Sequence, residues 1–408
     1  MRSTTINITQ VVRNGLCIGC GLCEAIAPDR VKMKMTDYGS LRPSPTNLFT
    51  TEEESRLLAC CPGVIAESRI KTELHKDLIW GHYSSMSYAW AGDPELRFRA
   101  AAGGALTALG VHLLKSRLAS FILHVRAIPE QPMRSQWTIS TTPEQVISSC
   151  GSRYGPVAPL AGLIQALDRN QPFAIIAKPC DIGAVHRYSQ LDSRVNELCV
   201  ARLVMVCGGQ SRLTKSSNLL KQLGVEEDEL SLFRYRGYGN PGSARVETTD
   251  GGAYEIGYVE LWQDEASWML ETRCKMCPDA LGEAADIAAS DVWPGGGPVG
   301  EDDGFDGIIV RSEIGEELIK GAVESGILVL GEQITAEQFN DFQPHQVRKK
   351  HALSARYQGM REAGLSDIKT VNLRLEELSK KFDSAQHKIQ VEGTKRRVRD
   401  GRIVEPAC

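Results

Sequence analysis

Four cysteines near the N-terminus have the spacing of ligands to an iron-sulfur cluster. Three form the run Cys17-Ile-Gly-Cys20-Gly-Leu-Cys23, and Cys61 follows at a distance, directly before Pro62. A C-x2-C-x2-C run lets three thiolates surround one face of a cubane, while a remote Cys-Pro supplies the fourth ligand. We therefore predict that these four cysteines hold a [4Fe-4S] cluster.

Zinc is the alternative for this set, but zinc sites usually use two separated cysteine pairs rather than three evenly spaced cysteines. Gly19 and Gly21 allow backbone amides to come close to the sulfurs, which helps to set the potential of a cluster. Cys60 adjoins Cys61, and neighbouring side chains diverge. Because only Cys61 precedes a proline, we expect Cys60 to be a buried thiol.

A second set of four cysteines is dispersed along the chain. Cys180 and Cys207 each end an apolar run, and Cys274-Lys-Met-Cys277 forms a close pair. A single C-x2-C is also compatible with a thioredoxin-like dithiol, although that motif lies directly between a strand and a helix. Here the pair follows a helical-looking segment, residues 262–270. A parallel sheet would bring Cys180 and Cys207 side by side, so a second cluster and a dithiol both stay open.

Composition narrows the class of protein. The 408 residues are 42% hydrophobic and 24% charged, as in ordinary globular proteins, and a net charge of -4 argues against a general nucleic-acid binder. Residues 1–13 lack the pattern of a signal peptide, and no apolar run reaches the roughly 20 residues of a spanning helix. We therefore expect a cytoplasmic protein, in which twelve cysteines indicate metal or redox chemistry rather than disulfides.

The elements that must position these residues alternate between helix and strand. The pattern predicts helices at 104–117, 143–149 and 156–168, and strands at 121–127, 136–141, 173–177 and 202–206. Residues 230–256 are typical of antiparallel strands joined at Asp250-Gly251-Gly252. The fold class is therefore α/β with α+β elements.

Three domains follow from these patterns. Residues 1–70 form a small ferredoxin-like [4Fe-4S] module, residues 71–337 a flavin-binding α/β catalytic domain, and residues 338–408 a helical C-terminal extension. The extension places Leu373, Leu375 and Leu378 on one face and ends in basic residues 395–402. A solvated helix is the preferred interpretation of this tail, and contact with a partner is the alternative.

Several stretches together resemble the coenzyme F420 hydrogenase/dehydrogenase beta-subunit family, which includes ferredoxin-dependent chlorophyll-pathway reductases. They are RFRAAAGGALTAL (97–109), SCGSRYGPVAP (149–159), KPCDIGAVH (178–186), VCGGQS (206–211) and RCKMCPDALGEAADIAASD (273–291). The resemblance implies an FAD-containing α/β domain with a nearby [4Fe-4S] cluster on Cys180, Cys207, Cys274 and Cys277. Ala102 departs from the family, which commonly has serine there.

Candidate flavin contacts follow from the resemblance and from side-chain chemistry. Gly103 and Gly104 precede a helix, so their amides can approach a pyrophosphate, and tight packing is the alternative role. The candidate cofactor-binding residues are Ala102, Gly103, Gly104, Thr107, Ser152, Arg153, Tyr154, Lys178, Asp181 and Asp291. Asp181 and Asp291 are expected to support the contacting groups rather than to touch the flavin, and a solvated or capping role is the alternative for both. A surface ion pair is the alternative for Arg153 and Lys178. No catalytic residue is assigned, because the histidines lack carboxylate partners at motif spacing.

Three functions are compatible with these residues. The first is a reductase in which electrons from a ferredoxin-type donor pass through two [4Fe-4S] clusters to FAD and then to a small organic substrate. The second is an electron-transfer subunit that docks on a hydrogenase or dehydrogenase partner. The third is a coenzyme F420 oxidoreductase. The sequence does not identify the substrate or the oligomeric state.

Overall fold

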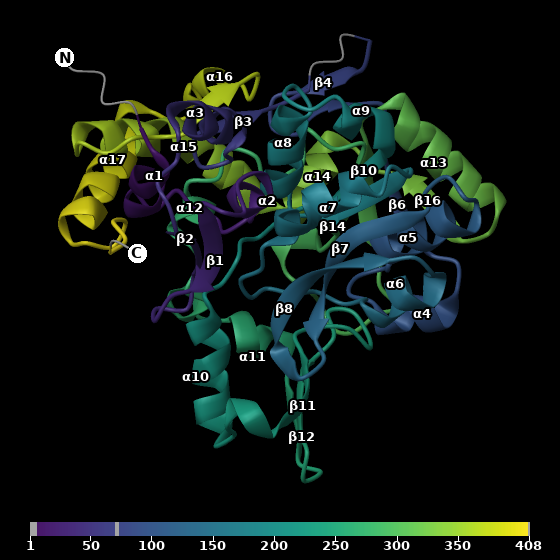
Figure 1. Cartoon of the computed structure of the whole chain (residues 1–408). Coiled ribbons are helices and arrows are strands. Elements are labelled where there is room, and N and C mark those ends of the chain that lie inside the picture. Colours follow the sequence, from purple (N-terminus) through teal and green to yellow (C-terminus); the bar gives the residue numbers. More distant parts are fainter. Residues whose placement is uncertain (1–5, 70–72, 407–408) are drawn as a thin grey trace.

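An eight-stranded mixed sheet forms the centre of the molecule (Figure 1). The computed structural model describes residues 6–69 and 73–406. The strand order is β16-β6-β15-β14-β10-β9-β7-β8. Strands β7, β9, β10 and β14 are parallel, and the outer strands pair antiparallel. The strands of this sheet are β6 (Ser85–Ala91), β7 (Phe121–Ile128), β8 (Gln131–Ser140), β9 (Phe173–Ala177), β10 (Cys199–Met205), β14 (Ile287–Asp291), β15 (Asp306–Val310) and β16 (Leu328–Gln333).

Helices cover both faces of the sheet because its central strands are apolar on both sides. In β9, Phe173 and Ile175 pack into one core, while the alternate residues Ala174 and Ile176 pack into a second core. This alternation is the period-two pattern of a strand buried on both faces. The helices that accompany the sheet strands in the sequence are α4 (Pro94–Arg99), α5 (Ala105–Lys115), α6 (Pro143–Ser148), α7 (Leu163–Asp168), α8 (Pro179–Tyr188), α9 (Arg194–Leu198) and α13 (Glu313–Glu324). A further helix, α10 (Leu213–Leu223), follows β10 in the sequence.

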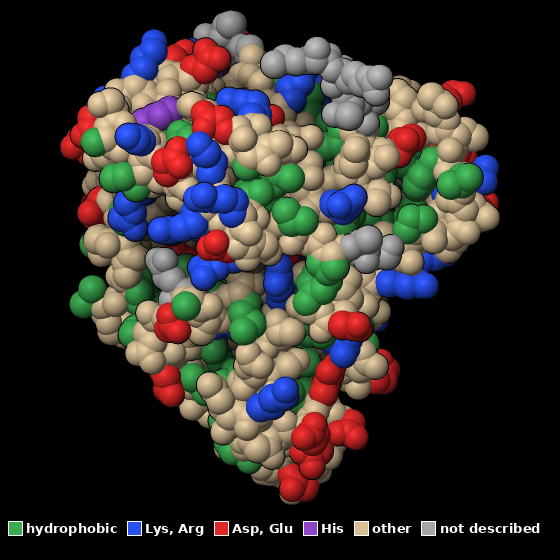
Figure 2. Space-filling view, turned by 90° about the vertical axis from the view of Figure 1, so that its left-hand side faces the viewer, with side chains coloured by type: hydrophobic (Ala, Val, Ile, Leu, Met, Phe, Trp, Pro, Cys, Tyr) green, Lys and Arg blue, Asp and Glu red, His purple; other side chains and the backbone are tan. Residues whose placement is uncertain are grey.

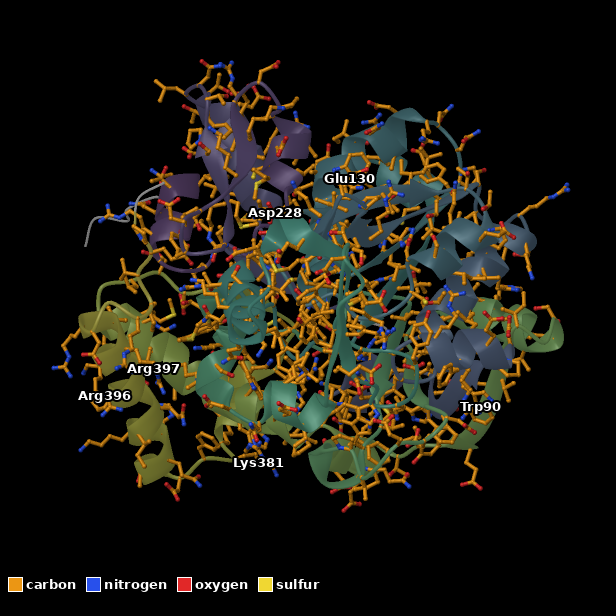
Figure 3. All side chains as sticks on the ribbon, turned by 90° about the horizontal axis from the view of Figure 1, so that it is seen from below. Trp90, Glu130, Asp228, Lys381, Arg396 and Arg397 are labelled. Carbon is orange, nitrogen blue, oxygen red and sulfur yellow. The ribbon has the colours of Figure 1, made fainter. Side chains whose placement is uncertain are left out.

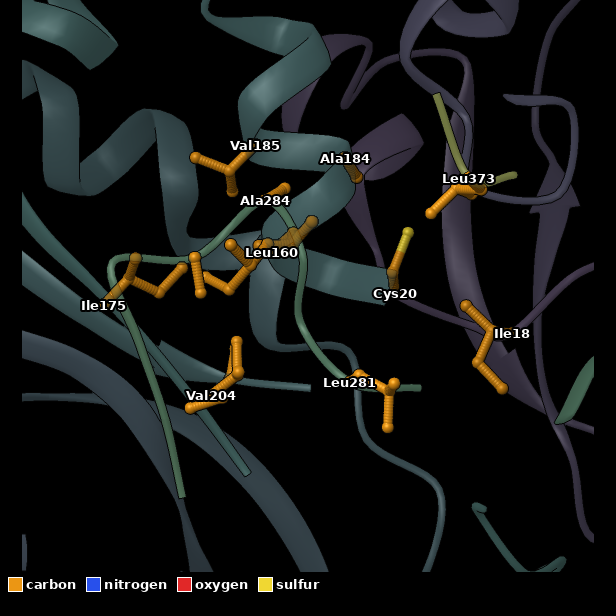
Figure 4. Close-up of a cluster of buried hydrophobic side chains, with 14 of the residues drawn as sticks. Ile18, Cys20, Leu160, Ile175, Ala184, Val185, Val204, Leu281, Ala284 and Leu373 are labelled. Atoms are coloured by element: carbon orange, nitrogen blue, oxygen red, sulfur yellow. The ribbon is translucent and has the colours of Figure 1, made fainter. Parts of the chain in front are cut away.

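The N-terminal segment packs against the larger core. Its elements are α1 (Ile8–Arg13), α2 (Leu22–Ile26), β1 (Val31–Met35), β2 (Leu41–Pro45), α3 (Thr51–Cys60) and β3 (Ile65–Glu67). Figure 4 shows Ile18 and Cys20 at the edge of the same core that contains Leu160 and Val204. The domain boundary expected near residue 70 falls at residues 70–72, which lie outside the described residues.

The C-terminal segment is also part of this core. It comprises α14 (Ala336–Phe342), α15 (Pro344–Glu362), β17 (Lys369–Val371), α16 (Leu375–Ser379) and α17 (Ser384–Arg399). Strand β17 pairs in parallel with β3 of the N-terminal segment. Leu353 and Met360 are fully buried, and so are the three leucines that the sequence placed on one face. The expectation of a solvated helix is therefore wrong for most of this segment, because these apolar side chains cover the N-terminal segment and the sheet. The basic end of α17 is exposed, as are residues 384–386 at its start.

The remaining elements include a second, smaller sheet and the buried helix α12 (Thr272–Lys275). Besides α12, they are β4 (His75–Asp77), β5 (Gly81–Tyr83), β11 (Leu230–Arg234), β12 (Ala244–Thr248), β13 (Ala253–Ile256) and α11 (Tyr258–Trp262). The antiparallel strands expected at 230–256 are confirmed as a separate three-stranded sheet. The helical-looking segment at 262–270 is instead the end of α11 and one short 3-10 turn. Among the described residues, no helix is long and apolar enough to cross a membrane.

Candidate metal centres

The four N-terminal cysteines line one cavity. Cys17, Cys20, Cys23 and Cys61 surround an empty volume of about 480 Å³. The loop between Cys17 and Cys23 is tightly turned, since Gly19 has a φ of 73°, and a Cβ there would lie 2.5 Å from the carbonyl oxygen of Leu41. The fold thus brings a remote cysteine to the three-cysteine run, as the sequence indicated.

Cys60 has a different environment from its neighbour Cys61. It is 1% exposed, and its Sγ donates to the carbonyl oxygens of Arg56 and Leu57 in the preceding turn of α3. Burial raises the pKa of the Cys60 thiol to about 12. Cys60 borders the same cavity, but its thiol is engaged by α3, in agreement with the expectation of a buried thiol.

The four dispersed cysteines line a second cavity. Cys180, Cys207, Cys274 and Cys277 surround an empty volume of about 320 Å³. Strands β9 and β10 are parallel neighbours, so the chain leaves both at the same edge of the sheet and brings Cys180 and Cys207 together. The pair at the end of α12 completes the set. Lys178 and Arg273 also line this cavity.

The two cavities share a wall. Ile18, which lies in the loop between Cys17 and Cys20, borders both of them. Gln210 spans the same wall. Its backbone N–H donates to the Sγ of Cys274 over 3.2 Å, and its side-chain amide donates to the carbonyl oxygen of Ile18 over 3.3 Å. Sequence reasoning did not assign Gln210, although it lies in the stretch 206–211.

The donor sets fit polynuclear clusters better than single ions. Among the described residues, no three His, Cys, Asp or Glu side chains converge closely enough for one metal ion. Thiolates on the corner irons of a cubane stand farther apart than ligands of one ion, which suits four thiols around a cavity. Burial raises the pKa of Cys17 and of Cys274 to about 12, so these thiols need a bound metal to become thiolates near neutral pH.

Nearby cations offset part of the energetic cost of burying ionised cysteine thiols at the second cavity. The pKa of Cys180 is raised well above its usual value by burial and by the charge of Asp181, while Lys178 and Arg273 act in the opposite direction. The Nζ of Lys178 lies 2.9 Å from the carboxylate of Asp181, which is fully buried. Lys178 therefore places its charge at the second cavity, and Asp181 both balances that charge and caps α8.

The glycine turn before α5 has a partner within the protein. The carboxylate of Asp306 accepts from the N–H groups of Gly103 and Ala105 over 3.1 and 2.8 Å. A Cβ at Gly103 would lie 2.9 Å from the carbonyl oxygen of Ala89. Asp306 thus takes the amide of Gly103, and the glycine also serves close packing, which is the alternative role given for it in the sequence. Its contact with a pyrophosphate stays a prediction. Ala102 is buried with a φ of 52° in this turn, and Thr107 is half-buried one turn later.

Arg153 also differs from both interpretations of the sequence. Its guanidinium donates to the hydroxyl of Ser135 and to four backbone carbonyl oxygens, those of Pro132, Met133, Arg134 and Phe233. These bonds join β8 to β11, and they leave the group neither in a surface ion pair nor free to bind a phosphate. Ser152 is half-buried beside it.

Tyr154 and Asp291 lie close to an arginine that the sequence did not single out. Arg236 donates to both oxygens of Asp291 over 3.1 and 3.0 Å, and its guanidinium stacks on Tyr258 and Trp293. Asp291 and then Tyr154 raise the pKa of the Arg236 guanidinium against the effect of burial. No motif marks Arg236, so only the fold reveals this group of charged and aromatic side chains.

A buried ion triad joins three distant segments. Arg42 of β2 donates to Glu271 and to Glu405, each over 2.6 Å, and all three side chains are almost completely buried. Glu271 lies one turn before Cys274 and accepts the backbone N–H of that cysteine through its carbonyl oxygen. The triad therefore ties the N-terminal segment and the C-terminal tail to the loop that carries Cys274 and Cys277.

Comparison with known proteins identifies the family. Two family models, which describe the N-terminal and the C-terminal parts of the coenzyme F420 hydrogenase/dehydrogenase beta subunit, match the chain at residues 86–165 and 171–335, respectively. Together these ranges cover more than half of the chain. The chain belongs to the coenzyme F420 hydrogenase/dehydrogenase beta-subunit family. This result confirms the resemblance seen in the sequence. The second set of cysteines lies inside the matched ranges, whereas the first set precedes them.

Relatives in this beta-subunit family are parts of oxidoreductases. The coenzyme F420 hydrogenase subunit beta of Methanococcus voltae is 24% identical over 260 residues, which are 61% of this chain and 84% of the relative. The F420-dependent formate dehydrogenase 1 subunit beta of Methanococcus maripaludis is 26% identical over 251 residues, and the match spans 60% of each protein. The chain is thus an oxidoreductase-type protein with an electron-transfer role.

A solved structure shows the same fold. A chain of the F420-reducing [NiFe] hydrogenase complex from Methanosarcina barkeri superposes with a TM-score of 0.55 and 18% sequence identity. The superposition covers 72% of this protein and 99% of that chain. The mixed α/β fold expected from the sequence is therefore confirmed.

Proposed function

We propose that this protein is an electron-transferring beta-type subunit that holds two [4Fe-4S] clusters and FAD. The observation that carries the proposal is the pair of cavities, each lined by four cysteines and separated by the shared residue Ile18. Two clusters bound in adjacent cavities that share a wall could pass electrons to one another over a short distance. The placement of the second set within the matched beta-subunit ranges supports the same proposal.

The chain's own residues would hold and tune these groups. The first cluster would bind Cys17, Cys20, Cys23 and Cys61, and the second would bind Cys180, Cys207, Cys274 and Cys277. Bound there, cubanes carry single electrons, and a flavin pairs two electrons for hydride exchange. Lys178 would stabilise the added negative charge when the second site is reduced, because its ammonium lines that cavity.

The proposed position of FAD depends on Lys178 and on the family resemblance. We place the flavin beside the second cavity, since Lys178 lies there and the family resemblance implies a flavin next to this cluster. Ser152, Tyr154 and Thr107 stay candidate contacts, and Asp181 and Asp291 stay candidate supporting residues. The amides near Gly103 are a weaker candidate for the pyrophosphate, because Asp306 already accepts from them.

The relatives suggest the partners. They are named as subunits of a coenzyme F420 hydrogenase and of an F420-dependent formate dehydrogenase. By analogy we propose that this chain docks on an oxidoreductase subunit and exchanges a hydride between its flavin and a deazaflavin coenzyme of the F420 type. The sequence offered both roles as alternatives, an electron-transfer subunit of a hydrogenase or dehydrogenase and a coenzyme F420 oxidoreductase.

A reductase fed by a ferredoxin-type donor is the second candidate, and one observation favours it. Cys17, Cys20, Cys23 and Cys61 lie before residue 86, outside both matched ranges. A complete extra cluster site added before the shared part of the family would provide a separate route for single electrons. The acceptor would then be a small organic substrate.

Cofactor analysis and coenzyme kinetics test the proposal. Protein purified without oxygen should contain about eight iron and eight acid-labile sulfide per chain, together with about one FAD. When the reduced protein is mixed with oxidised F420, the absorption spectrum of its flavin should return to that of the oxidised form, at a rate fast enough for catalytic turnover. Stoichiometric zinc with little iron would exclude the cluster sites. Reoxidation by alkenes or carbonyl compounds, but not by F420, would favour the ferredoxin-fed reductase.

A further inference from the structure

Positive side chains gather on the face that contains the second cavity. Figure 2 shows Lys and Arg side chains around a hollow on this face. We define the cationic patch as Lys275 of α12, Lys349 and Arg356 of α15, Arg397 of α17 and Arg212 before α10. Five cations thus come from four separate parts of the chain. In Figure 3, Arg397 lies on the opposite side of the molecule from Trp90.

These cations act on one another. One Nη of Arg356 donates to the carbonyl oxygen of Lys275 over 2.9 Å. The side chain of Lys275 is exposed beside this contact, so a second positive charge lies next to Arg356. Burial and then Arg397 lower the pKa of Arg356. Such mutual repulsion is unfavourable in the isolated protein.

Carboxylates of the chain do not neutralise the cationic patch. Across residues 6–69 and 73–406, its one ion pair within 4.0 Å joins Arg212 to Glu271 over 3.9 Å, and Glu271 is already bound by Arg42. By contrast, Lys395 on the same helix as Arg397 pairs with Glu362 and Glu392. Lys395 thus shows that α17 has a cation that is paired with carboxylates, whereas Arg397 in the cationic patch has no such ion pair among the described residues.

The cationic patch lies directly over the second set of cysteines. Lys275 stands between Cys274 and Cys277 in the sequence, and Lys349 borders the cavity that these cysteines line. Acidic residues 226–229 lie instead at the distant end of the molecule, beside β11. A protein with net charge -4 thus presents a positive face at one redox site and a negative end elsewhere.

We propose that the cationic patch is the docking surface for an acidic redox protein that exchanges electrons with the second cysteine site. The inference rests on the proposed function and adds the location and the charge of the partner. A spread of cations over four elements suits a broad protein surface, whereas a small anion is bound by converging donors in a pocket. A carboxylate-rich partner offsets the repulsion and is steered toward the site.

Charge reversal at Arg397 tests the proposal, with an acidic bacterial [4Fe-4S] ferredoxin as the probe. Two quantities are measured on the full-length holoprotein: the affinity for oxidised ferredoxin, and the second-order rate constant for reduction by reduced ferredoxin. Arg397→Glu should weaken both about five- to tenfold at low ionic strength, with a smaller loss at high salt. Arg397→Lys should resemble the wild type. Lys320→Glu, an exposed cation on α13, is the matched control.

The outcomes separate the docking surface from its alternatives. Equal weakening by Lys320→Glu would show an effect of net charge and overturn the proposal. An unchanged ferredoxin affinity with a higher KM for F420 would assign the cationic patch to a small anion instead. Reduction by methyl viologen needs no protein docking and reports on the redox cofactors. If it fails in the wild type while ferredoxin still binds through Arg397, the proposed function fails and the docking surface stands.

Discussion

The backbone N–H of Gln210 donates a hydrogen bond to the Sγ of Cys274 over 3.2 Å. The side chain of the same glutamine reaches the carbonyl oxygen of Ile18, in the loop of the first cysteine set. One residue thus contacts a thiol of the second site and the backbone of the first. Since Gln210 is only 2% exposed, water does not replace the bond to Ile18 when the side chain is removed.

Gln210→Ala should loosen the connection between the two sites without removing either cluster. The backbone bond to Cys274 persists, but the carbonyl of Ile18 loses its donor. The free energy of unfolding should fall by about 1 to 3 kcal/mol, the cost of an unsatisfied buried group. Anaerobic denaturant unfolding and iron analysis measure both effects. Gln263→Ala, at an exposed position, should leave stability unchanged, and an equal loss there would contradict the assignment.

Cys277→Ser should remove the second cluster and preserve the first. Serine is a poor replacement for a thiolate at iron, so iron should fall from about eight to about four per chain. The loop at 273–291 would lose its connection to β9 and β10, and FAD occupancy and thermal stability should fall as well. Cys60→Ser is the matched control and should keep full iron. Full iron and normal turnover in Cys277→Ser would exclude Cys277 as a ligand.

Substitutions of Lys178 and Asp181 should move the potential of the second site in opposite directions. Lys178→Met removes a positive charge from the cavity wall, which disfavours the reduced state and lowers the potential by tens of millivolts. Asp181→Asn removes the negative partner and should raise it. Lys178→Arg keeps the positive charge, so its potential should be close to that of the wild type. Potentiometric titration followed by electron paramagnetic resonance measures these shifts. Shifts of the same sign would indicate disrupted packing rather than electrostatics.

Asp306→Asn should change how stability depends on pH. Burial raises the pKa of Asp306 to about 7 from the ordinary 3.8. Between these values the unfolded carboxyl loses its proton while the folded one keeps it, so Asp306 costs stability as pH rises from about 4 to 7. An asparagine oxygen can still accept from Gly103 and Ala105.

The variant should therefore be more stable than the wild type at pH 7 to 8, by roughly 1 to 3 kcal/mol, and the difference should shrink toward pH 5. Urea unfolding at several pH values measures this. Asp303→Asn, whose side chain is 88% exposed, should show no such trend. Lower stability of Asp306→Asn at pH 8 would mean that the ionised carboxylate is the stabilising form.

The sequence, together with the family resemblance, predicted which eight cysteines line the two cavities. Cys17, Cys20 and Cys23 are held together by short covalent connections, so their spacing is local information. Cys180 and Cys207 follow apolar strands, and the parallel pairing of β9 and β10 brings such strand ends to one edge of a sheet. The resemblance to the beta-subunit family added Cys274 and Cys277 to this set. Local spacing therefore suffices to predict the first set, whereas the second set also needed the family resemblance.

Only the tertiary structure decided how these parts relate to one another. Asp306 lies about two hundred residues after the glycine turn whose amides it occupies, and no local pattern encodes such a partner. The triad of Arg42, Glu271 and Glu405 likewise joins three distant segments. Pairing of buried charges depends on where whole elements pack. For the same reason, the sequence did not place Ile18 between the two cavities or the basic end of α17 beside Lys275.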